Sequence, residues 1–198
     1  MKHKSLYDDL YTSGYHNKFG FTHSKPLIGK MAKFIKPGKK ILDAGCSNGT
    51  AVKLMLDKGY DAHGVDISDI AIKLTKANNV PNCKVSSVTK IDYPRNSFHA
   101  LLCTDVLEHI DPDEATMVES EFRRILKSKG TLFLNIALKK EINDTWIKWV
   151  KKSKYKLNCL HTLVKPAQYW KKLFNKNKYT YLYSDISGHA LTLILRKK

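Results

Sequence analysis

The chain has 198 residues, of which 42% are hydrophobic, and it carries a net charge of +17. This length and hydrophobic content predict one folded domain over residues 1–198 and exclude wholesale disorder. No apolar run approaches the ~18 residues of a membrane span, and no secretory signal opens the chain, so we expect a cytoplasmic protein with no membrane contact. None of the four cysteines forms a Cys-x-x-Cys pair, which disfavours a zinc knuckle or redox motif and favours reduced thiols near a core.

Helices and strands alternate along the predicted chain. Helices are predicted over residues 4–12, 24–35, 48–58, 68–77, 111–127, 142–153 and 166–175, and strands over residues 40–44, 61–66, 84–88, 98–104, 131–137, 179–184 and 190–196. Such alternation is typical of a parallel sheet with right-handed crossovers. We therefore predict an α/β, Rossmann-like fold with a seven-stranded, mostly parallel sheet, an antiparallel last strand and helices on both faces.

The predicted domain has four segments with unequal charge. They are N-terminal lid helices (1–37), a cofactor-binding core (38–138), a basic segment on the acceptor side (139–178) and a C-terminal hairpin (179–198). Residues 1–40 carry +7 and residues 139–178 carry +10, whereas residues 41–138 carry −2. A generally lysine-rich composition is one explanation, and an anionic partner bound by the flanks is the other.

A glycine-rich turn follows the first predicted strand. Gly45 and Gly49 are spaced G-x-x-x-G, which differs from the G-x-G-x-x-G of dinucleotide sites and from the Gly-Lys-Ser/Thr of phosphate loops. Asp66 ends the next strand, where a carboxylate can accept both hydroxyls of a ribose. Asp43 precedes the turn, where it would attract a cation and repel a pyrophosphate. The alternative is that both acids only cap turns.

These motifs resemble the class I S-adenosylmethionine (SAM)-dependent methyltransferases over residues 38–138. The resemblance implies that SAM is the cofactor. It places the methionine part at Asp43, Gly45 and Gly49 with Cys46 and Ser47 in the same turn, the ribose at Asp66, the adenine at Ile67, Ser87 and Val88, and the methyl-transfer cleft at Thr104 and Asp105. The family often has an aspartate where Ser87 stands, so the adenine contact departs from its pattern.

The acceptor side is expected around Asp105-Val106-Leu107-Glu108-His109. In a helical turn Asp105, Glu108 and His109 would share one face, and these are the predicted catalytic residues. The motif resembles the Glu-x-x-Glu-His of ubiquinone-biosynthesis O-methyltransferases and small-RNA 2′-O-methyltransferases, which contributes there to a magnesium or similar site. That resemblance adds His161 as a fourth ligand for Mg²⁺ or another divalent metal. The alternatives are a metal-free cleft with His109 as base, and a purely structural histidine.

The expected function is O-methylation of a small metabolite, anionic ones included, by a SAM-dependent methyltransferase. Tyr11 and Tyr15 are expected to contact the acceptor from the first lid helix. No Asn/Asp-Pro-Pro-Tyr/Phe or Pro-Cys motif follows the fourth strand, which disfavours methylation of base amino groups and of pyrimidine carbon 5. Two alternatives remain: an RNA 2′-O-methyltransferase whose basic flanks bind phosphates, and a non-catalytic SAM-binding regulatory module.

Overall fold

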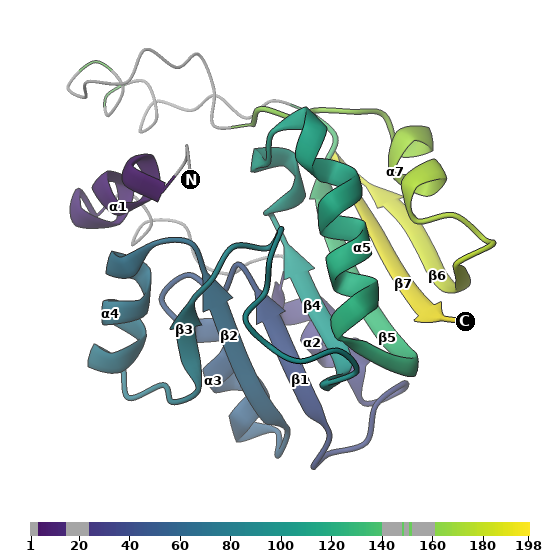
Figure 1. The fold of residues 1–198 in the computed structure, drawn as a ribbon, viewed down its shortest axis with the longest axis horizontal. Helices are drawn as coiled ribbons and strands as arrows, with labels where there is room; N and C mark the ends of the chain where they lie inside the picture. The colour runs from purple at the N-terminus through teal and green to yellow at the C-terminus, as the bar shows by residue number, and fades with distance from the viewer. Residues whose placement is uncertain (1–3, 15–23, 140–147, 149–150, 152–160) are drawn as a thin grey trace.

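The computed structural model describes residues 4–14, 24–139 and 161–198, together with Lys148 and Lys151. These residues form one seven-stranded sheet with the order β3-β2-β1-β4-β5-β7-β6 (Figure 1). Its strands are β1 (Lys40–Ala44), β2 (Asp61–Asp66), β3 (Cys83–Val85), β4 (Phe98–Thr104), β5 (Leu126–Ala137), β6 (Tyr179–Ser187) and β7 (Ala190–Lys197). Only β7 runs antiparallel to its neighbours, and this confirms the predicted fold class.

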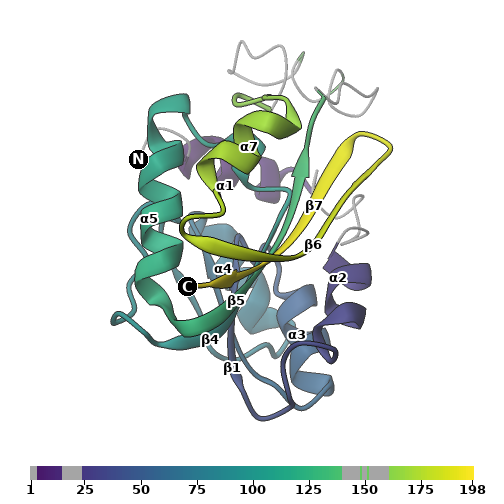
Figure 2. The same cartoon turned by 90° about the vertical axis from the view of Figure 1, so that its right-hand side faces the viewer.

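Helices cover both faces of this sheet. They are α1 (Lys4–Thr12), α2 (Ser24–Met31), α3 (Thr50–Asp57), α4 (Asp69–Ala77), α5 (Ala115–Ile125) and α7 (Ala167–Leu173). One apolar cluster joins the sheet to α2, α3 and α4, and a second joins its other face to α5 and α7. Figure 2 shows α7 beside the β6–β7 hairpin. No helix in the described ranges is long and apolar enough to cross a bilayer.

The sheet places the candidate site at the carboxyl ends of its central strands. β1 pairs in parallel with β2 on one side and β4 on the other, so the chain leaves β1 where the strand order reverses. Ligands of open α/β sheets bind at such a switch point. The strands there are apolar on both faces, and Leu101, Leu102 and Cys103 of β4 are fully buried. The glycine turn therefore leaves the sheet at a buried end of β1.

The start of α5 agrees with the prediction from the sequence, but its end does not. Asp111 and Glu114 form the predicted capping box, and Pro112–Glu114 make a 3-10 turn that leads into α5. The predicted helix to residue 127 is wrong, because α5 ends at Ile125 and β5 begins at Leu126. Leu126 pairs with Phe98 before a bulge in the β4–β5 ladder, so sheet pairing replaces the last helical turn.

The predicted strand over residues 84–88 is also too long, since β3 ends at Val85. The Ser86 N–H still donates to the Asp66 carbonyl of β2 (2.8 Å), but the Ser86 hydroxyl accepts a hydrogen bond from the Asp92 N–H (3.0 Å) and donates to the Lys90 carbonyl (3.1 Å), so the chain folds into a loop after Val85. Side-chain bonds of this kind compete with strand pairing. The predicted helix over residues 142–153 lies outside the described residues, apart from Lys148 and Lys151.

Candidate active site

The glycine turn after β1 is held tightly against β2. The backbone N–H groups of Gly45 and Cys46 both donate to the Val65 carbonyl, at 2.8 and 2.9 Å. Gly45 has a φ of +90°, and a Cβ built on it would lie 2.3 Å from Cγ2 of Val106. Gly49 has a φ of +83° and precedes α3. Only glycine combines this conformation with so close a neighbour, and the bare backbone is left facing the end of the sheet.

Asp66 at the end of β2 anchors the same turn. Its carboxylate accepts hydrogen bonds from the backbone N–H groups of Ser47 (2.9 Å) and Ser68 (3.0 Å). Burial raises the pKa of Asp66, while these bonds and one from the Ile67 N–H oppose the rise. The side chain is 8% exposed, so it lies at the floor of the site. The geometry brings Asp66, Ile67, Ser47 and the glycine turn together, as predicted for one cofactor site.

Asp43 is a buried acid beneath the glycine turn. Burial, followed by the nearby Cys83 and Asp66, raises its pKa to about 8. Among the described residues, no lysine, arginine or histidine forms an ion pair with it. A buried carboxylate is stable in its charged form only beside a compensating cation. The sulfonium and ammonium groups of SAM are cations of this kind, so this position fits the cofactor that the sequence implies.

Helix α1 covers the carboxyl ends of β2 and β3 beside α4 (Figure 1). Tyr11 of this helix shares a side-chain hydrogen bond with Ser47, and burial followed by the charge of Asp66 raises the pKa of Tyr11. The ring of Tyr7 meets the ring of His109 edge-on, with centroids 6.2 Å apart. The predicted substrate residue Tyr15 lies outside the described residues. Tyr7 was not among the predicted site residues; it lies four residues before Tyr11 in α1, so the two share one face of the helix.

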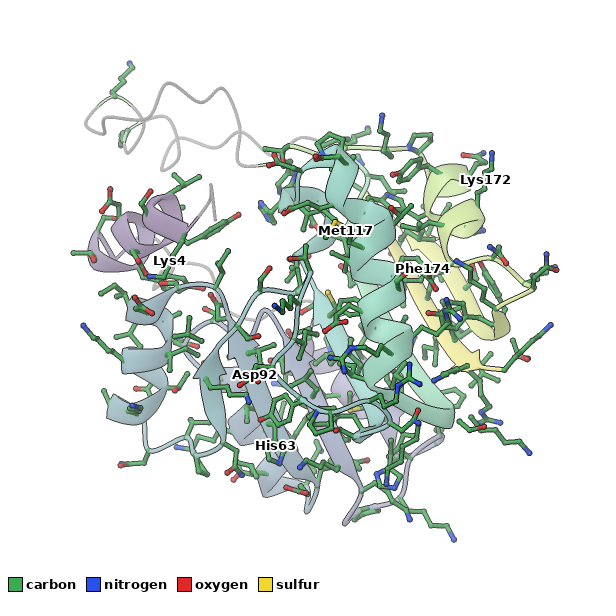
Figure 3. All side chains as sticks on the ribbon, in the orientation of Figure 1. Lys4, His63, Asp92, Met117, Lys172 and Phe174 are labelled. Carbon is green, nitrogen blue, oxygen red and sulfur yellow. The ribbon has the colours of Figure 1, made fainter. Side chains whose placement is uncertain are left out.

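The helix α1 is docked onto the first turn of α4. Oδ1 of Asp8 accepts hydrogen bonds from Oγ of Ser68 (2.5 Å) and from the N–H of Ile70 (3.3 Å). Lys4 bridges Asp8 and Asp69, and Figure 3 shows it on the side of α1 that faces α4. Burial raises the pKa of Asp8, but the bonds from Ser68, Lys4 and Ile70 outweigh it and leave the pKa lowered. The charge pattern of α1 gave no local signal for these partners.

Three of the four proposed metal-ligating residues lie together. Ligand atoms of Glu108, His109 and His161 all lie within 4.8 Å of one another. Asp105 is not part of this group, and the predicted helical face of Asp105, Glu108 and His109 is wrong. Asp105 has a φ of +55° and donates its N–H to the Asn135 carbonyl (3.1 Å), so the helical turn begins only at Leu107.

Glu108 and His161 have fixed orientations in this group. Oε1 of the fully buried Glu108 accepts a hydrogen bond from the Ala137 N–H (3.1 Å), and the Glu108 carbonyl accepts one from the Leu163 N–H (2.8 Å). Nδ1 of His161 lies 2.9 Å from the Lys139 carbonyl, which can only accept. Nδ1 therefore carries a proton and donates it to this carbonyl. The His109 and His161 rings meet edge-on, with centroids 4.8 Å apart.

The remaining predicted site residues take up three positions. Oγ1 of Thr104, at the end of β4, lies 2.9 Å from Oγ of Ser24 in α2, a contact that sequence reasoning missed. Oγ of Ser87 is 2.8 Å from Oγ1 of Thr89 within its own loop. Val88 packs against the α5 side of the core. Ser87 and Val88 as adenine contacts stay predictions.

A separate pocket of about 240 Å³ lies at the opposite edge of the sheet, at the amino ends of β1 and β4. Its lining includes His99 and four lysines, Lys36, Lys39, Lys127 and Lys129, and none of its lining residues is acidic. This pocket is distinct from the glycine turn and the histidine pair.

Sequence comparison gives a domain family and several relatives. Residues 42–134 match the profile described as a methyltransferase domain. The chain is 30% identical over 130 residues to the ubiquinone biosynthesis O-methyltransferase of Nitrosomonas europaea, which covers 60% of this chain and 50% of that protein. It is 32% identical over 110 residues to the human eEF1A lysine and N-terminal methyltransferase, covering 52% of this chain and 16% of that protein. The chain thus spans half or less of these relatives.

Solved structures share the whole fold at low sequence identity. The Burkholderia thailandensis 1,6-didemethyltoxoflavin-N1-methyltransferase, solved with S-adenosylhomocysteine, superposes with a TM-score of 0.75 at 16% identity over 98% of this chain and 87% of that one. The magnesium protoporphyrin IX methyltransferase of Synechocystis, also with S-adenosylhomocysteine, gives 0.74 at 15% identity over 98% of both chains. The profile and the fold agree: residues 42–134 match a methyltransferase domain, and the chain as a whole has the fold of these solved methyltransferases.

Proposed function

We propose that this chain is a cytoplasmic enzyme that methylates an oxygen atom of a small metabolite, including acceptors with an anionic group. The observation that carries the proposal is the convergence of Glu108, His109 and His161, whose ligand atoms lie within 4.8 Å of one another. An imidazole in this group can take the proton of an acceptor hydroxyl. The similarity to a ubiquinone biosynthesis O-methyltransferase supports oxygen as the acceptor atom.

The proposed reaction asks the protein mainly for positioning. When bound, SAM supplies an activated methyl group on a sulfonium. Asp43 and the backbone of the glycine turn bind the positively charged end, and Asp66 binds the ribose. Tyr7 and Tyr11 exclude water from above, and an in-line approach of the acceptor supplies most of the rate acceleration. His161, or its neighbour His109, accepts the proton that the acceptor hydroxyl loses.

The same three side chains also fit a metal site. One carboxylate and two imidazoles are donors that Mn²⁺, Fe²⁺, Co²⁺ or Zn²⁺ accept, whereas Mg²⁺ prefers oxygen ligands. The Nδ1–H of His161 on the Lys139 carbonyl is the outer contact that metal-ligating histidines make. A bound metal would lower the pKa of an acceptor hydroxyl. Activity that survives a chelator would leave the histidines as metal-free bases.

The test is turnover with a panel of acceptors, read as S-adenosylhomocysteine formed. The panel contains phenols, carboxylates, phosphorylated metabolites and a lysine peptide. With the acceptor found, His161→Ala should lower kcat at least 100-fold while the dissociation constant of S-adenosylhomocysteine stays within twofold. Asp57→Ala, on an exposed carboxylate of α3, is the matched control and should leave both values unchanged. Full activity of His161→Ala would refute His161 as the base and leave His109 in that role.

A second candidate is methylation of RNA. It is favoured by the +10 charge of residues 139–178 and the +7 of residues 1–40. Phosphate-driven binding is strongest at low salt. Calorimetric titration with a short RNA at 20 and 200 mM salt distinguishes RNA from a small metabolite as the acceptor. No binding at 20 mM would exclude RNA.

A non-catalytic SAM-binding module is the third candidate. It would bind the cofactor without turnover. Steady formation of S-adenosylhomocysteine with any acceptor of the panel would exclude it.

A further inference from the structure

Two cysteine side chains from different elements converge above Gly64 in β2. A Cβ built on Gly64 would lie 2.7 Å from Sγ of Cys46 and 2.8 Å from Sγ of Cys83. Both sulfur atoms therefore lie within 2.8 Å of one point. Cys83 pairs with Gly64 in the β2–β3 ladder, whereas Cys46 belongs to the glycine turn. The absence of a Cys-x-x-Cys motif hid this pair, because only the folded sheet brings the two thiols together.

The two thiols have unequal environments. They share a side-chain hydrogen bond, which raises the pKa of Cys46 and lowers that of Cys83. Burial raises the pKa of Cys46 further, and a bond to Thr75 helps to lower that of Cys83. Cys46 is 3% exposed, whereas Cys83 is partly exposed. Cys83 is therefore the thiol that becomes a thiolate and that a small oxidant can reach.

We propose that Cys46 and Cys83 are a site of reversible oxidation that closes to a disulfide on reaction with a hydroperoxide. The Cys83 thiolate attacks one peroxide oxygen, the O–O bond breaks, and Cys83 becomes a sulfenic acid; the released hydroxide takes up the proton that the Cys83 thiol lost and leaves as the first water. Cys46 then attacks the Cys83 sulfur, the S–O bond breaks, and the released hydroxide takes the Cys46 proton to leave as water. In sum, two thiols and one hydrogen peroxide give one disulfide and two waters.

The disulfide would act on the cofactor turn. A disulfide needs sulfurs about 2.05 Å apart, so its formation draws Cys46 and β3 toward each other. The Cys46 carbonyl accepts the Gly49 N–H (2.9 Å), and the next residue, Ser47, donates to Asp66. Pulling Cys46 therefore displaces the groups that bind the cofactor, a consequence that rests on the proposed function. By linkage, bound cofactor should disfavour the disulfide to the same extent.

The test uses the full chain carrying Cys159→Ser, treated with hydrogen peroxide and digested with trypsin without reduction. The expected product joins the peptides of residues 41–53 and 77–84 and is two hydrogen masses lighter than their sum. Dithiothreitol should reverse it. Cys103 is fully buried in β4, so it should stay reduced and serves as the internal control. A stable gain of oxygen mass on Cys83 without the link would overturn the proposal.

The functional consequence is read by calorimetry with S-adenosylhomocysteine. Peroxide should weaken binding at least tenfold in the Cys159→Ser chain and leave binding unchanged after Cys83→Ser is added. Saturating S-adenosylhomocysteine should slow the cross-link. A cross-linked chain with unchanged affinity would refute the link to the cofactor turn. A reduced chain that never binds S-adenosylhomocysteine would refute the proposed function alone, because the cross-link is measured by mass.

Discussion

Asp43 combines complete enclosure with the lack of a cationic partner among the described residues. With its pKa raised to about 8, the carboxyl is largely protonated at pH 7 in the free protein. A cation bound beside it favours the ionised form and lowers that pKa. Binding of SAM should therefore release close to one proton near pH 7, and affinity should fall up to tenfold per pH unit below 8.

Proton release is measured by titrating SAM calorimetrically in two buffers of different ionisation enthalpy. Asp43→Asn should bind at least tenfold more weakly and release no proton. The same variant should be more stable than the natural chain at pH 8, by about 1–3 kcal/mol, since a charge no longer has to be buried. Folding raises this pKa from 3.8, so the natural chain loses stability as pH rises from about 4 to 8, and the difference should vanish at pH 4. Equal stability of Asp43→Asn and the natural chain at pH 8 would contradict the raised pKa of Asp43.

Gly64 is required by its neighbours rather than by its backbone conformation. A methyl group there would overlap both Cys46 and Cys83. Gly64→Ala should destabilise the fold by about 1–3 kcal/mol through overpacking. A methyl group added at Gly29 in α2 would have nothing within 4 Å, so Gly29→Ala should instead stabilise by about 0.5–1 kcal/mol. Urea unfolding of both variants checks this, and a harmless Gly64→Ala would mean that the sulfurs move aside freely.

The docking of α1 depends chiefly on the carboxylate of Asp8, because it accepts hydrogen bonds from α4 and pairs with Lys4. Asp8→Ala should release the helix and uncover the cofactor site. We expect S-adenosylhomocysteine to dissociate at least fivefold faster, with a smaller change in its association rate. Stopped-flow displacement measures both rates. Asp57→Ala removes the same charge from α3 and should change neither rate; equal effects of the two variants would show a charge effect only.

Local signals predicted the element order, but long-range contacts decided the site. The capping box of Asp111 and Glu114 lies within four residues, so the sequence reveals it. The left-handed conformation of Asp105 arises beside Asn135 of β5, and the Asp8 contacts cross from α1 to α4. No short-range pattern encodes such pairs. For the same reason, the cofactor turn was readable from sequence while the arrangement on the acceptor side was not.

At the scale of the whole molecule, the charge of +17 opposes compaction. Part of this positive charge lies close together, because four lysines and no acidic residue line the pocket at the amino ends of β1 and β4. Screening shortens the reach of such repulsion from about 30 Å at 10 mM salt to about 8 Å at 150 mM. The melting temperature should therefore rise by several degrees between these concentrations.

The contribution of the pocket is isolated with Lys127→Gln combined with Lys129→Gln. This variant should melt higher than the natural chain at 10 mM salt and respond less to added salt. Lys58→Gln combined with Lys73→Gln removes the same charge from positions outside the pocket. Equal shifts in the two variants would show that net charge, and not its concentration at the pocket, sets the response.

Glu108 joins three stretches of chain at the candidate acceptor site. Its side chain receives the Ala137 N–H at the end of β5, and its carbonyl receives the N–H of Leu163. Under the proposed function, a role in folding and a role in turnover therefore meet in one residue. A substitution that removes the carboxylate loses the bond to Ala137, whereas the backbone bond to Leu163 is kept. Lineages that exchange one acceptor for another should accordingly alter the residues around Glu108 before they alter Glu108 itself.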